Sequence, residues 1–229
     1  MPPAHELPGA LARRDDGRGR LSGGVALSYP SDVTDLLART DAPVRTLFQR
    51  IAGPAAAASP DLTAIGAALV DLARDVDYLA PWVARLGDQT RALPIHTPER
   101  GPRLMLVHRR EGQMSAIHDH ATWAAISPIV GLETHRRYRV VGKGLAAPPE
   151  VVEARDLWPS DIATLLPPED LHDHGHLAGH GVPAYVLIMT GDDQTLFRRN
   201  EWDLSTGRHR VLEPGDGGRM LASQPMPNA

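Results

Sequence analysis

Residues 112–120 read Gly-Gln-Met-Ser-Ala-Ile-His-Asp-His and place two histidines, His118 and His120, two positions apart. Side chains alternate between the two faces of a β-strand, so residues i and i+2 project to the same side. We therefore expect the two imidazoles to face one point, where two ligands of a single metal ion would lie, and Asp119 to face away. A third histidine, His172, lies in a second strand-like stretch and completes a predicted three-histidine centre. Such a centre leaves coordination positions open, which is typical of catalytic rather than structural metal sites.

The sequence around these histidines predicts a mainly β domain. From about residue 95 onward, short apolar runs are separated by Gly, Pro and Asp, a pattern typical of an all-β sandwich or barrel. The expected strands are 103–109, 114–117, 122–130, 133–141, 151–157, 162–166, 184–190 and 196–203. We expect residues 95–212 to form the barrel that carries the metal site, and residues 213–229, rich in Gly and Pro, to form a C-terminal tail.

The first part of the chain has a different pattern. Residues 1–30 are rich in Gly, Arg, Asp and Pro and predict a loosely ordered N-terminal arm. Residues 31–94 predict a helical extension packed on the barrel. One helix is expected from about residue 31, with an interruption around residues 40–43. A second, amphipathic helix is expected to follow residues 59–61 and to continue to about residue 83.

Composition excludes several classes of protein. The chain has 229 residues, of which 42% are hydrophobic, enough for a core built from Leu, Val, Ile and Ala. The formal net charge is -4 and no Lys/Arg run occurs, which argues against a nucleic-acid partner. The absence of cysteine excludes disulfides and thiolate metal ligands. We expect neither a signal peptide nor a membrane span, and therefore a cytoplasmic location.

The spacing around the histidines resembles the paired motifs of the cupin superfamily. The first motif is carried by Gly112, His118 and His120, and the second by Pro167 and His172. A cupin usually has a Glu four or five residues after its second His, but Ala124 and Ala125 stand there, so the chain is similar to cupins with three His and no carboxylate ligand. The resemblance implies a double-stranded β-helix, or jelly-roll, barrel with an N-terminal helical extension.

A closer resemblance is to the bacterial thiol dioxygenases, which include cysteine dioxygenase and 3-mercaptopropionate dioxygenase. It covers about residues 100–200 and is carried by His118-Asp119-His120-Ala121-Thr122-Trp123, followed by Gly131-Leu132-Glu133 and Tyr138. The resemblance implies Fe(II) held by His118, His120 and His172. It also implies that the chain is an enzyme that oxidises a small thiol acid to a sulfinate with O2. Because cupins commonly dimerise, the resemblance implies a homodimer as well.

Two arginines are candidates for binding the substrate. In the dioxygenases an Arg in the region of Arg198 and Arg199 resembles a clamp for a substrate carboxylate, and a guanidinium is suited to that role through two parallel hydrogen bonds. Adjacent strand residues face opposite ways, so only one of the two can point inward, and Arg199 is the first candidate. Arg103 and Arg109 are the alternatives.

Other residues are expected beside the metal. His176 is predicted to move protons near pH 7, and Tyr185 to donate a hydrogen bond to bound oxygen, with Tyr138 as its alternative. Trp123 is predicted to form a wall of the metal pocket, to belong to the core, or both. The alternative third metal ligand is His174. The remaining candidates, His96, His108 and His135, are expected at the surface or in pairs with carboxylates.

One departure from the dioxygenase pattern leaves the activity open. The family's Ser-His-Tyr set has no counterpart before Gly191, where Leu187 or Ile188 and Met189 or Thr190 occupy the His and Tyr positions. This difference motivates a second hypothesis, another metal-dependent cupin oxygenase that acts on a non-thiol organic acid. A third hypothesis is a non-enzymatic cupin that binds a metal or a small ligand.

Overall fold

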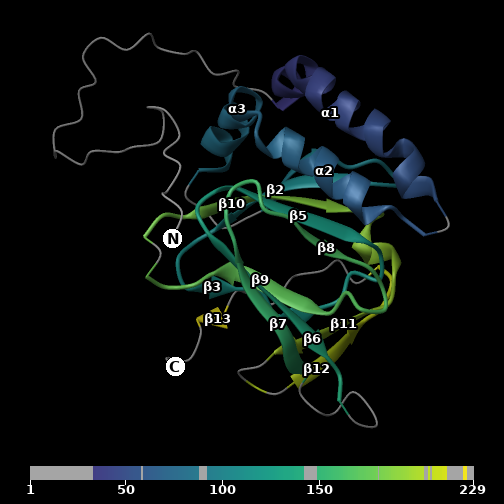
Figure 1. The fold of residues 1–229 in the computed structure, drawn as a ribbon, viewed down its shortest axis with the longest axis vertical. Helices are drawn as coiled ribbons and strands as arrows, with labels where there is room; N and C mark the ends of the chain where they lie inside the picture. Colours follow the sequence, from purple (N-terminus) through teal and green to yellow (C-terminus); the bar gives the residue numbers. More distant parts are fainter. Residues whose placement is uncertain are drawn as a thin grey trace.

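The structure is a computed structural model that describes residues 33–57, 59–87, 92–141, 149–179, 181–203, 206, 208–215 and 224–225. The predicted arm, residues 1–30, and most of the predicted tail lie outside these residues. Within them, three helices precede a set of antiparallel strands (Figure 1). None of the helices in these ranges is both long enough and apolar enough to span a membrane.

The helices differ from expectation in where they begin and end. They are α1 (Val33–Ala56), α2 (Leu62–Ala73) and α3 (Val76–Leu86). The carboxylates of Asp61 and Asp75 accept backbone N–H groups at the starts of α2 and α3. Because Asp75 begins a new helix, the single helix expected to about residue 83 is in fact two. The interruption expected around residues 40–43 is wrong, since α1 continues through Pro43 at the cost of one backbone donor.

One sheet lies under the helices. Its strands are, in spatial order, β1 (Ala92–His96), β2 (Arg103–Arg109), β10 (Ala184–Thr190), β5 (Ala124–Val130) and β8 (Ala163–Leu165). The helices cover its outer face (Figure 1), where Trp82 packs in one cluster with Leu104 and Leu187. Its inner face belongs to a second apolar cluster that contains Val107 and Val186. Strand β10 is therefore buried on both faces, as its continuous apolar sequence predicts.

The second sheet closes the barrel. Its strands are β12 (Arg208–Leu212), β11 (Arg199–Asp203), β4 (Ile117–His118), β9 (His172–His176), β3 (Gln113–Met114) and β13 (Gln224–Pro225), while β6 (Glu133–Arg139) pairs with β9 and with β7 (Glu150–Leu157). A short 3-10 helix, η1 (Gln194–Leu196), precedes β11. Two facing antiparallel sheets form a jelly-roll, or double-stranded β-helix, barrel. The predicted fold class, a mainly β cupin-type barrel with an N-terminal helical extension, is confirmed.

Some strands match their predicted bounds and others do not. Strands β2 and β10 match residue for residue. The strand expected at 114–117 is two short strands, β3 and β4, and the one expected at 196–203 begins only at Arg199 because η1 occupies its first residues. Strands β1, β12 and β13 have no predicted counterpart.

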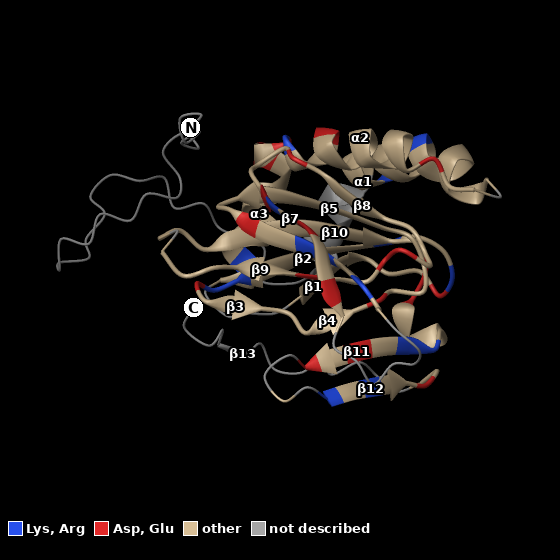
Figure 2. Cartoon of the chain, turned by 60° about the horizontal axis from the view of Figure 1, so that its bottom comes forward, with Lys and Arg blue, Asp and Glu red and all other residues tan. Residues whose placement is uncertain are grey.

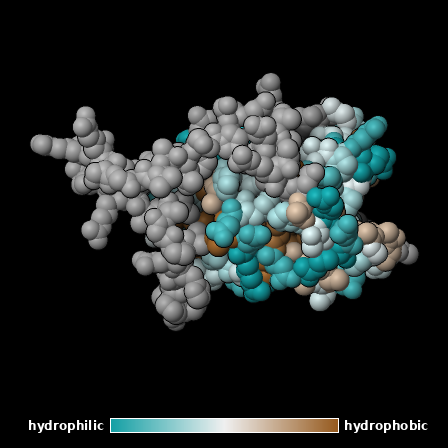
Figure 3. Space-filling view, turned by 90° about the horizontal axis from the view of Figure 1, so that it is seen from above, coloured by the Kyte–Doolittle hydropathy of each residue, from teal (hydrophilic) through white to brown (hydrophobic). Residues whose placement is uncertain are grey.

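The surface carries charges of both signs. Seen from the helical side, hydrophilic and neutral residues form most of the described surface in view (Figure 3). Basic and acidic residues both lie along β11, and basic residues lie on the neighbouring β12 (Figure 2). Arg210 lies 2.9 Å from Glu201, and Arg198 lies 3.2 Å from Glu213. Acidic and basic residues thus pair across these two strands at Arg210 and Glu201, and beside them at Arg198 and Glu213.

Strand β9 approaches β3 so closely that Gly175 has no room for a side chain. A Cβ at this position would lie 2.7 Å from Met114 Cα and closer still to the Gln113 carbonyl oxygen. Because Gly175 lies between His174 and His176, this contact sets the positions of both imidazoles.

We expect Gly175→Ala to destabilise the fold by about 1–3 kcal/mol, because the added methyl group must push the two strands apart. Urea unfolding measures the change. Gly53→Ala is the matched control, since Gly53 lies in α1 with nothing within 4 Å of the new Cβ, and it should stabilise by about 0.5–1 kcal/mol. Equal unfolding midpoints for the two variants would contradict the close approach.

Candidate metal centre

Strand β9 presents a row of histidines to the inside of the barrel. Its residues are His-Asp-His-Gly-His, and strand alternation puts His172, His174 and His176 on one face, where all three are buried. Asp173 faces the other way and accepts hydrogen bonds from Arg136 and Tyr138. Strand β9 has no large apolar residue, so the side chains that it buries inside the barrel are imidazoles.

His118 joins this row from the neighbouring strand β4. It lies directly opposite His172 in the sheet, and the two ring centroids are 4.4 Å apart. His118 Nδ1 donates to the Ala116 carbonyl oxygen over 2.9 Å, and His172 Nδ1 donates to the Asp170 carbonyl oxygen over the same distance. A carbonyl can only accept, so each ring keeps its lone pair on Nε2. Metal-binding histidines are commonly oriented by such a hydrogen bond on the other nitrogen.

His120 reaches the same point from a turn, not from the strand on which the sequence predicts it. Strand β4 ends at His118, and the chain turns through Ala121, whose φ is 53°. Asp170 Oδ2 accepts the backbone N–H groups of His120 and Ala121, each over 2.9 Å. These bonds leave His120 Nε2 3.1 Å from His118 Nε2. Asp170, rather than strand alternation, therefore positions His120.

The sequence pattern does not single out Asp170, although this residue joins the two histidine motifs. Its carboxylate holds the turn that carries His120, and its backbone oxygen orients the His172 ring. Burial raises the pKa of Asp170, while the backbone N–H groups that it accepts oppose the rise. The one sequence signal that could have identified Asp170 is its position, two residues before the predicted ligand His172.

The nitrogen atoms fit a metal ion. Metal–nitrogen bonds of about 2.0–2.1 Å bring two ligands at a right angle to within about 3 Å of each other. The 3.1 Å between His118 Nε2 and His120 Nε2 is close to this value. His172 Nε2 is buried and has no hydrogen-bond partner among the described residues, and its ring lies 4.8 Å from that of His120. A buried nitrogen without a partner is costly, and a metal bond would remove that cost.

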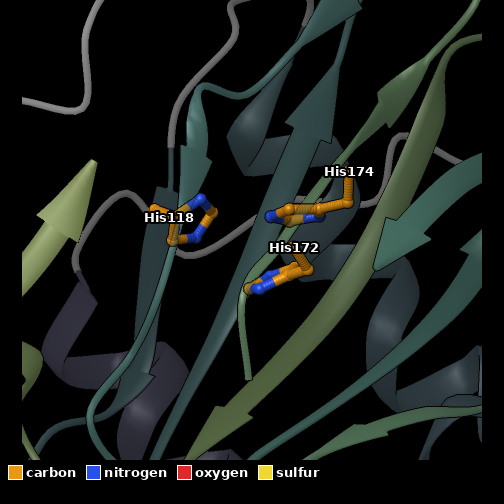
Figure 4. A group of neighbouring side chains, drawn as sticks. All are labelled: His118, His172 and His174. Carbon is orange, nitrogen blue, oxygen red and sulfur yellow. The ribbon is translucent and has the colours of Figure 1, made fainter. Parts of the chain in front are cut away.

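A fourth imidazole, His174, lies beside these three. Ring nitrogens of His118, His172 and His174 lie within 4.8 Å of one another, and Figure 4 shows the rings of His172 and His174 side by side, facing His118. A group of three histidines that could hold a metal ion is thus present. His174 differs in its partners: its Nδ1 lies 2.5 Å from Glu133 Oε1, and its Nε2 lies 3.1 Å from Arg109 Nη2.

Burial keeps these imidazoles neutral. Burial, with a smaller contribution from the nearby charges of His174 and Arg199, lowers the pKa of His118 to about 3. Burial also lowers the pKa of His120 and of His172 well below the usual range. A metal binds the deprotonated ring, so near pH 7 these side chains are already in the form that ligation requires.

His135 and Glu133 also lie near the site. His135, expected at the surface or beside a carboxylate, is buried and stacks on His172 with ring centroids 5.2 Å apart. Its burial lowers its pKa to about 3. Burial raises the pKa of Glu133 to about 7, while the Arg109 guanidinium opposes the rise. The site is thus wider than the predicted three ligands and includes a buried carboxylate and a buried guanidinium.

The two candidate anchors face opposite ways, as strand alternation requires. Arg199 is buried, donates to Gln194 Oε1 over 3.1 Å, and has an Nε without a partner among the described residues. Arg198 is exposed and pairs with Glu213. Arg199 is therefore the one that lies toward the histidines, and its role as the anchor stays a prediction.

The structure does not bring Trp123 and Tyr185 to the histidines. Both belong to the apolar cluster between the first sheet and the helices. Tyr185 stacks on His108 at 4.7 Å and donates its hydroxyl to the Gly87 carbonyl oxygen over 3.2 Å. Tyr138, the alternative donor, belongs to a small cluster on the outer face of the second sheet. Because β10 is buried on both faces, its apolar sequence does not reveal which face lies inside the barrel.

His176 shares the inner face of β9 with the other histidines. It is fully buried, and its Nδ1 donates to the Leu132 carbonyl oxygen over 2.7 Å. A part in moving protons stays a prediction for this residue.

Replacing Asp170 with Ala removes the acceptor of two backbone N–H groups and releases the turn that carries His120. We expect the affinity for a divalent metal to fall by about 10–100-fold, measured by competition with a chelator. Asp161→Ala is the control, because Asp161 also accepts a backbone N–H, that of Trp158, but in an exposed turn. Unchanged affinity in Asp170→Ala would rule out the positioning role.

No protein-family model and no curated protein matches this chain. Among solved structures, it is similar to an uncharacterised conserved protein with a double-stranded β-helix domain from Klebsiella pneumoniae, at 16% identity and a TM-score of 0.34 over 46% of this chain and 74% of that chain. It is also similar to a cupin superfamily protein from Desulfitobacterium hafniense, at 12% identity and a TM-score of 0.35. That match covers 46% of this chain and 80% of the other. A third similar structure is a hydroquinone 1,2-dioxygenase in complex with Cd2+ and 4-hydroxybenzonitrile, at 12% identity and a TM-score of 0.37. That match covers 48% of this chain and 69% of the other. Similarity at this level does not extend to substrate or activity.

Proposed function

We propose that the chain is a non-haem iron dioxygenase that oxidises a small thiol acid to a sulfinate with O2. The observation that carries the proposal is the convergence of His118, His120 and His172 as buried, neutral imidazoles. Fe(II) bound there would supply open positions and the redox chemistry between a thiolate and O2. Both oxygen atoms enter the sulfinate: sulfur loses four electrons and O2 gains four, so no other reductant is needed.

The protein's own part is to orient the ligands and to select an anion. The carbonyl oxygens of Ala116 and Asp170 hold the rings of His118 and His172. Neutral ligands leave the charge of a divalent ion uncompensated, which favours a substrate with a thiolate. Apart from Arg109, the inner face of the opposite sheet carries buried apolar residues such as Val107, and this wall would keep water from the reacting groups.

Arg199 is the proposed anchor for the substrate carboxylate. Its guanidinium is buried yet makes one hydrogen bond to a neutral amide, that of Gln194, among the described residues. It lies near enough to the metal ligands that its charge lowers the pKa of both His118 and His120, although burial is the larger cause. A carboxylate would offer this guanidinium two charge-assisted hydrogen bonds.

A second candidate function is a metal-dependent oxygenase that acts on a non-thiol organic acid. The observation that favours it is the position of the Tyr185 hydroxyl, which is bound to Gly87 on the helical side of β10. Leu187 and Met189 belong to the same helix-facing cluster, and Ile188 to the apolar inner face. No polar relay of the thiol dioxygenase kind therefore lies on β10. A non-enzymatic metal-binding cupin is the third candidate.

The proposal implies small-molecule partners, namely a thiol or other organic acid and O2. Neither nucleic acid nor a membrane is an expected partner. A cytoplasmic location and a homodimer stay predictions from the sequence.

The activity is tested with protein loaded with Fe(II) under anaerobic conditions and then mixed with O2 and a panel of small thiol acids. We expect thiol-dependent O2 consumption at one O2 per thiol, and a sulfinate that carries two labelled atoms when 18O2 is used. The same panel includes the matching hydroxy acids. O2 consumption with hydroxy acids alone would favour the second candidate, and none with iron verified would favour the third.

The anchor is tested by Arg199→Ala. We expect the KM for an acidic substrate to rise about thirty- to a thousandfold, because loss of a buried charge pair costs about 2–4 kcal/mol. Arg198→Ala is the matched control, since Arg198 is the exposed neighbour and should leave KM nearly unchanged. If both variants have equally small effects, neither arginine binds the carboxylate.

A further inference from the structure

The inner wall of the barrel holds one imidazole more than an open metal site needs. His174 stands two residues after His172 on the same strand face, and ring nitrogens of His118, His172 and His174 lie within 4.8 Å of one another. Ligand nitrogens of one metal ion lie about 3–3.5 Å apart, so the His174 ring would enter the ligand set by moving closer to the other two. Four protein ligands are typical of a closed, structural site, whereas three leave a position for substrate.

We infer that Arg109 holds His174 away from the metal and so limits the site to three imidazoles; the inference rests on the metal centre of the proposed function. A guanidinium has donors only, so the contact of 3.1 Å between Arg109 Nη2 and His174 Nε2 must use the lone pair of that nitrogen. The other ring nitrogen donates to Glu133 Oε1 over 2.5 Å. Both nitrogens of His174 are thereby occupied, and neither can bind a metal without breaking a contact.

The way this contact is built supports the inference. Arg109 is the last residue of β2, in the opposite sheet, on the same strand face as Val107, whose side chain belongs to the inner apolar cluster. Its side chain crosses the barrel and is only 4% exposed. A buried cation at this place repels a divalent ion that approaches His174, while the buried carboxylate of Glu133 balances the guanidinium charge. Both nitrogens of His174 thus have a partner without a metal.

His118 and His172 differ from His174 in the partners of their ring nitrogens. Each donates its Nδ1–H to a backbone carbonyl, and neither Nε2 faces a cationic side chain in a hydrogen bond of the described residues. On one wall of the barrel, His118 and His172 therefore keep a lone pair for a metal, whereas the lone pair of the neighbouring His174 accepts a hydrogen bond from Arg109. Arg109 thereby determines which imidazoles can bind the metal.

The experiment counts imidazoles on Co(II) or Zn(II) bound to the full chain, by X-ray absorption, and measures azide binding to the Co(II) protein. We expect three imidazoles and azide binding in the unaltered chain. In Arg109→Met we expect four imidazoles, a metal affinity higher by about tenfold or more, and azide binding weaker by a similar factor. Arg109→Lys, which keeps a charged donor, should retain three imidazoles.

Two further variants locate the effect. Adding His174→Ala to Arg109→Met should return the count to three. Arg103→Met is the matched control, because Arg103 lies on the same strand and face but pairs with Asp193, and its count should stay at three. Three imidazoles in Arg109→Met, or four in Arg103→Met, would overturn the inference.

A second measurement holds even if Arg109→Met does not fold. In the otherwise unaltered chain, His174→Ala should change metal affinity by less than about threefold, whereas His172→Ala and His120→Ala should each lower it by more than tenfold. A loss of tenfold or more in His174→Ala would mean that His174 is a ligand and would overturn the inference. A chain that binds no metal would overturn both the inference and the proposed function. A three-imidazole site that fails to oxidise thiols would overturn the proposed activity alone.

Discussion

Two hydrogen bonds to one carboxylate fix the turn that carries His120 to the segment that precedes β9. Asp170 Oδ2 accepts the backbone N–H groups of His120 and Ala121, and the Asp170 carbonyl orients the His172 ring. The two motifs lie about fifty residues apart in sequence. Strand pairing joins β9 to β4 at His118 and to β3 at Gln113 and Met114, but none of these pairs reaches His120, which lies beyond the end of β4. Ala121 adopts a left-handed backbone conformation, which a residue with a side chain adopts at some cost, so the turn depends on these bonds.

The barrel interior divides into two walls of different chemistry. The sheet under the helices contributes apolar side chains, while β9 and β4 contribute imidazoles that are equally buried. Burial of polar groups is tolerated where each one has a partner, and here one nitrogen of each of several rings is satisfied by a backbone carbonyl. The second nitrogen is then left for chemistry, which is how a rigid β scaffold can present several basic atoms in a small volume.

How well each strand and helix could be predicted from the sequence depends on the pattern of apolar and turn residues that it carries. Strands β2 and β10 have apolar runs bounded by turn residues, and their bounds were predicted to the residue. Strand β9 is built from His, Asp and Gly, so hydrophobic patterning detects it poorly even though it is fully buried. The separate helix α3 depends on Asp75, whose capping role competes with a continuous amphipathic pattern.

The same distinction applies to the site. The spacing of His118 and His120, with His172 in a second motif, points to a metal centre because the residue types and their intervals match a known pattern, although Asp170 and not the local strand positions His120. The contact of Arg109 with His174 joins strands 65 residues apart, and no local pattern contains it. Tyr185 was misplaced for another reason: on a strand buried on both faces, an apolar sequence carries no information about direction.

Strand β7 has a consequence for encounters between copies of the chain. It pairs with β6 in the second sheet and is exposed from Glu150 to Asp156. Its exposed valines, Val151 and Val152, would favour pairing with another strand, but Glu153 and Arg155 follow them. The Glu153 carboxylate pairs with both Arg155 and Arg137. An incoming strand would have to displace these ion pairs before it could form backbone hydrogen bonds, so the charged edge works against the indefinite strand-to-strand stacking that leads to fibrils.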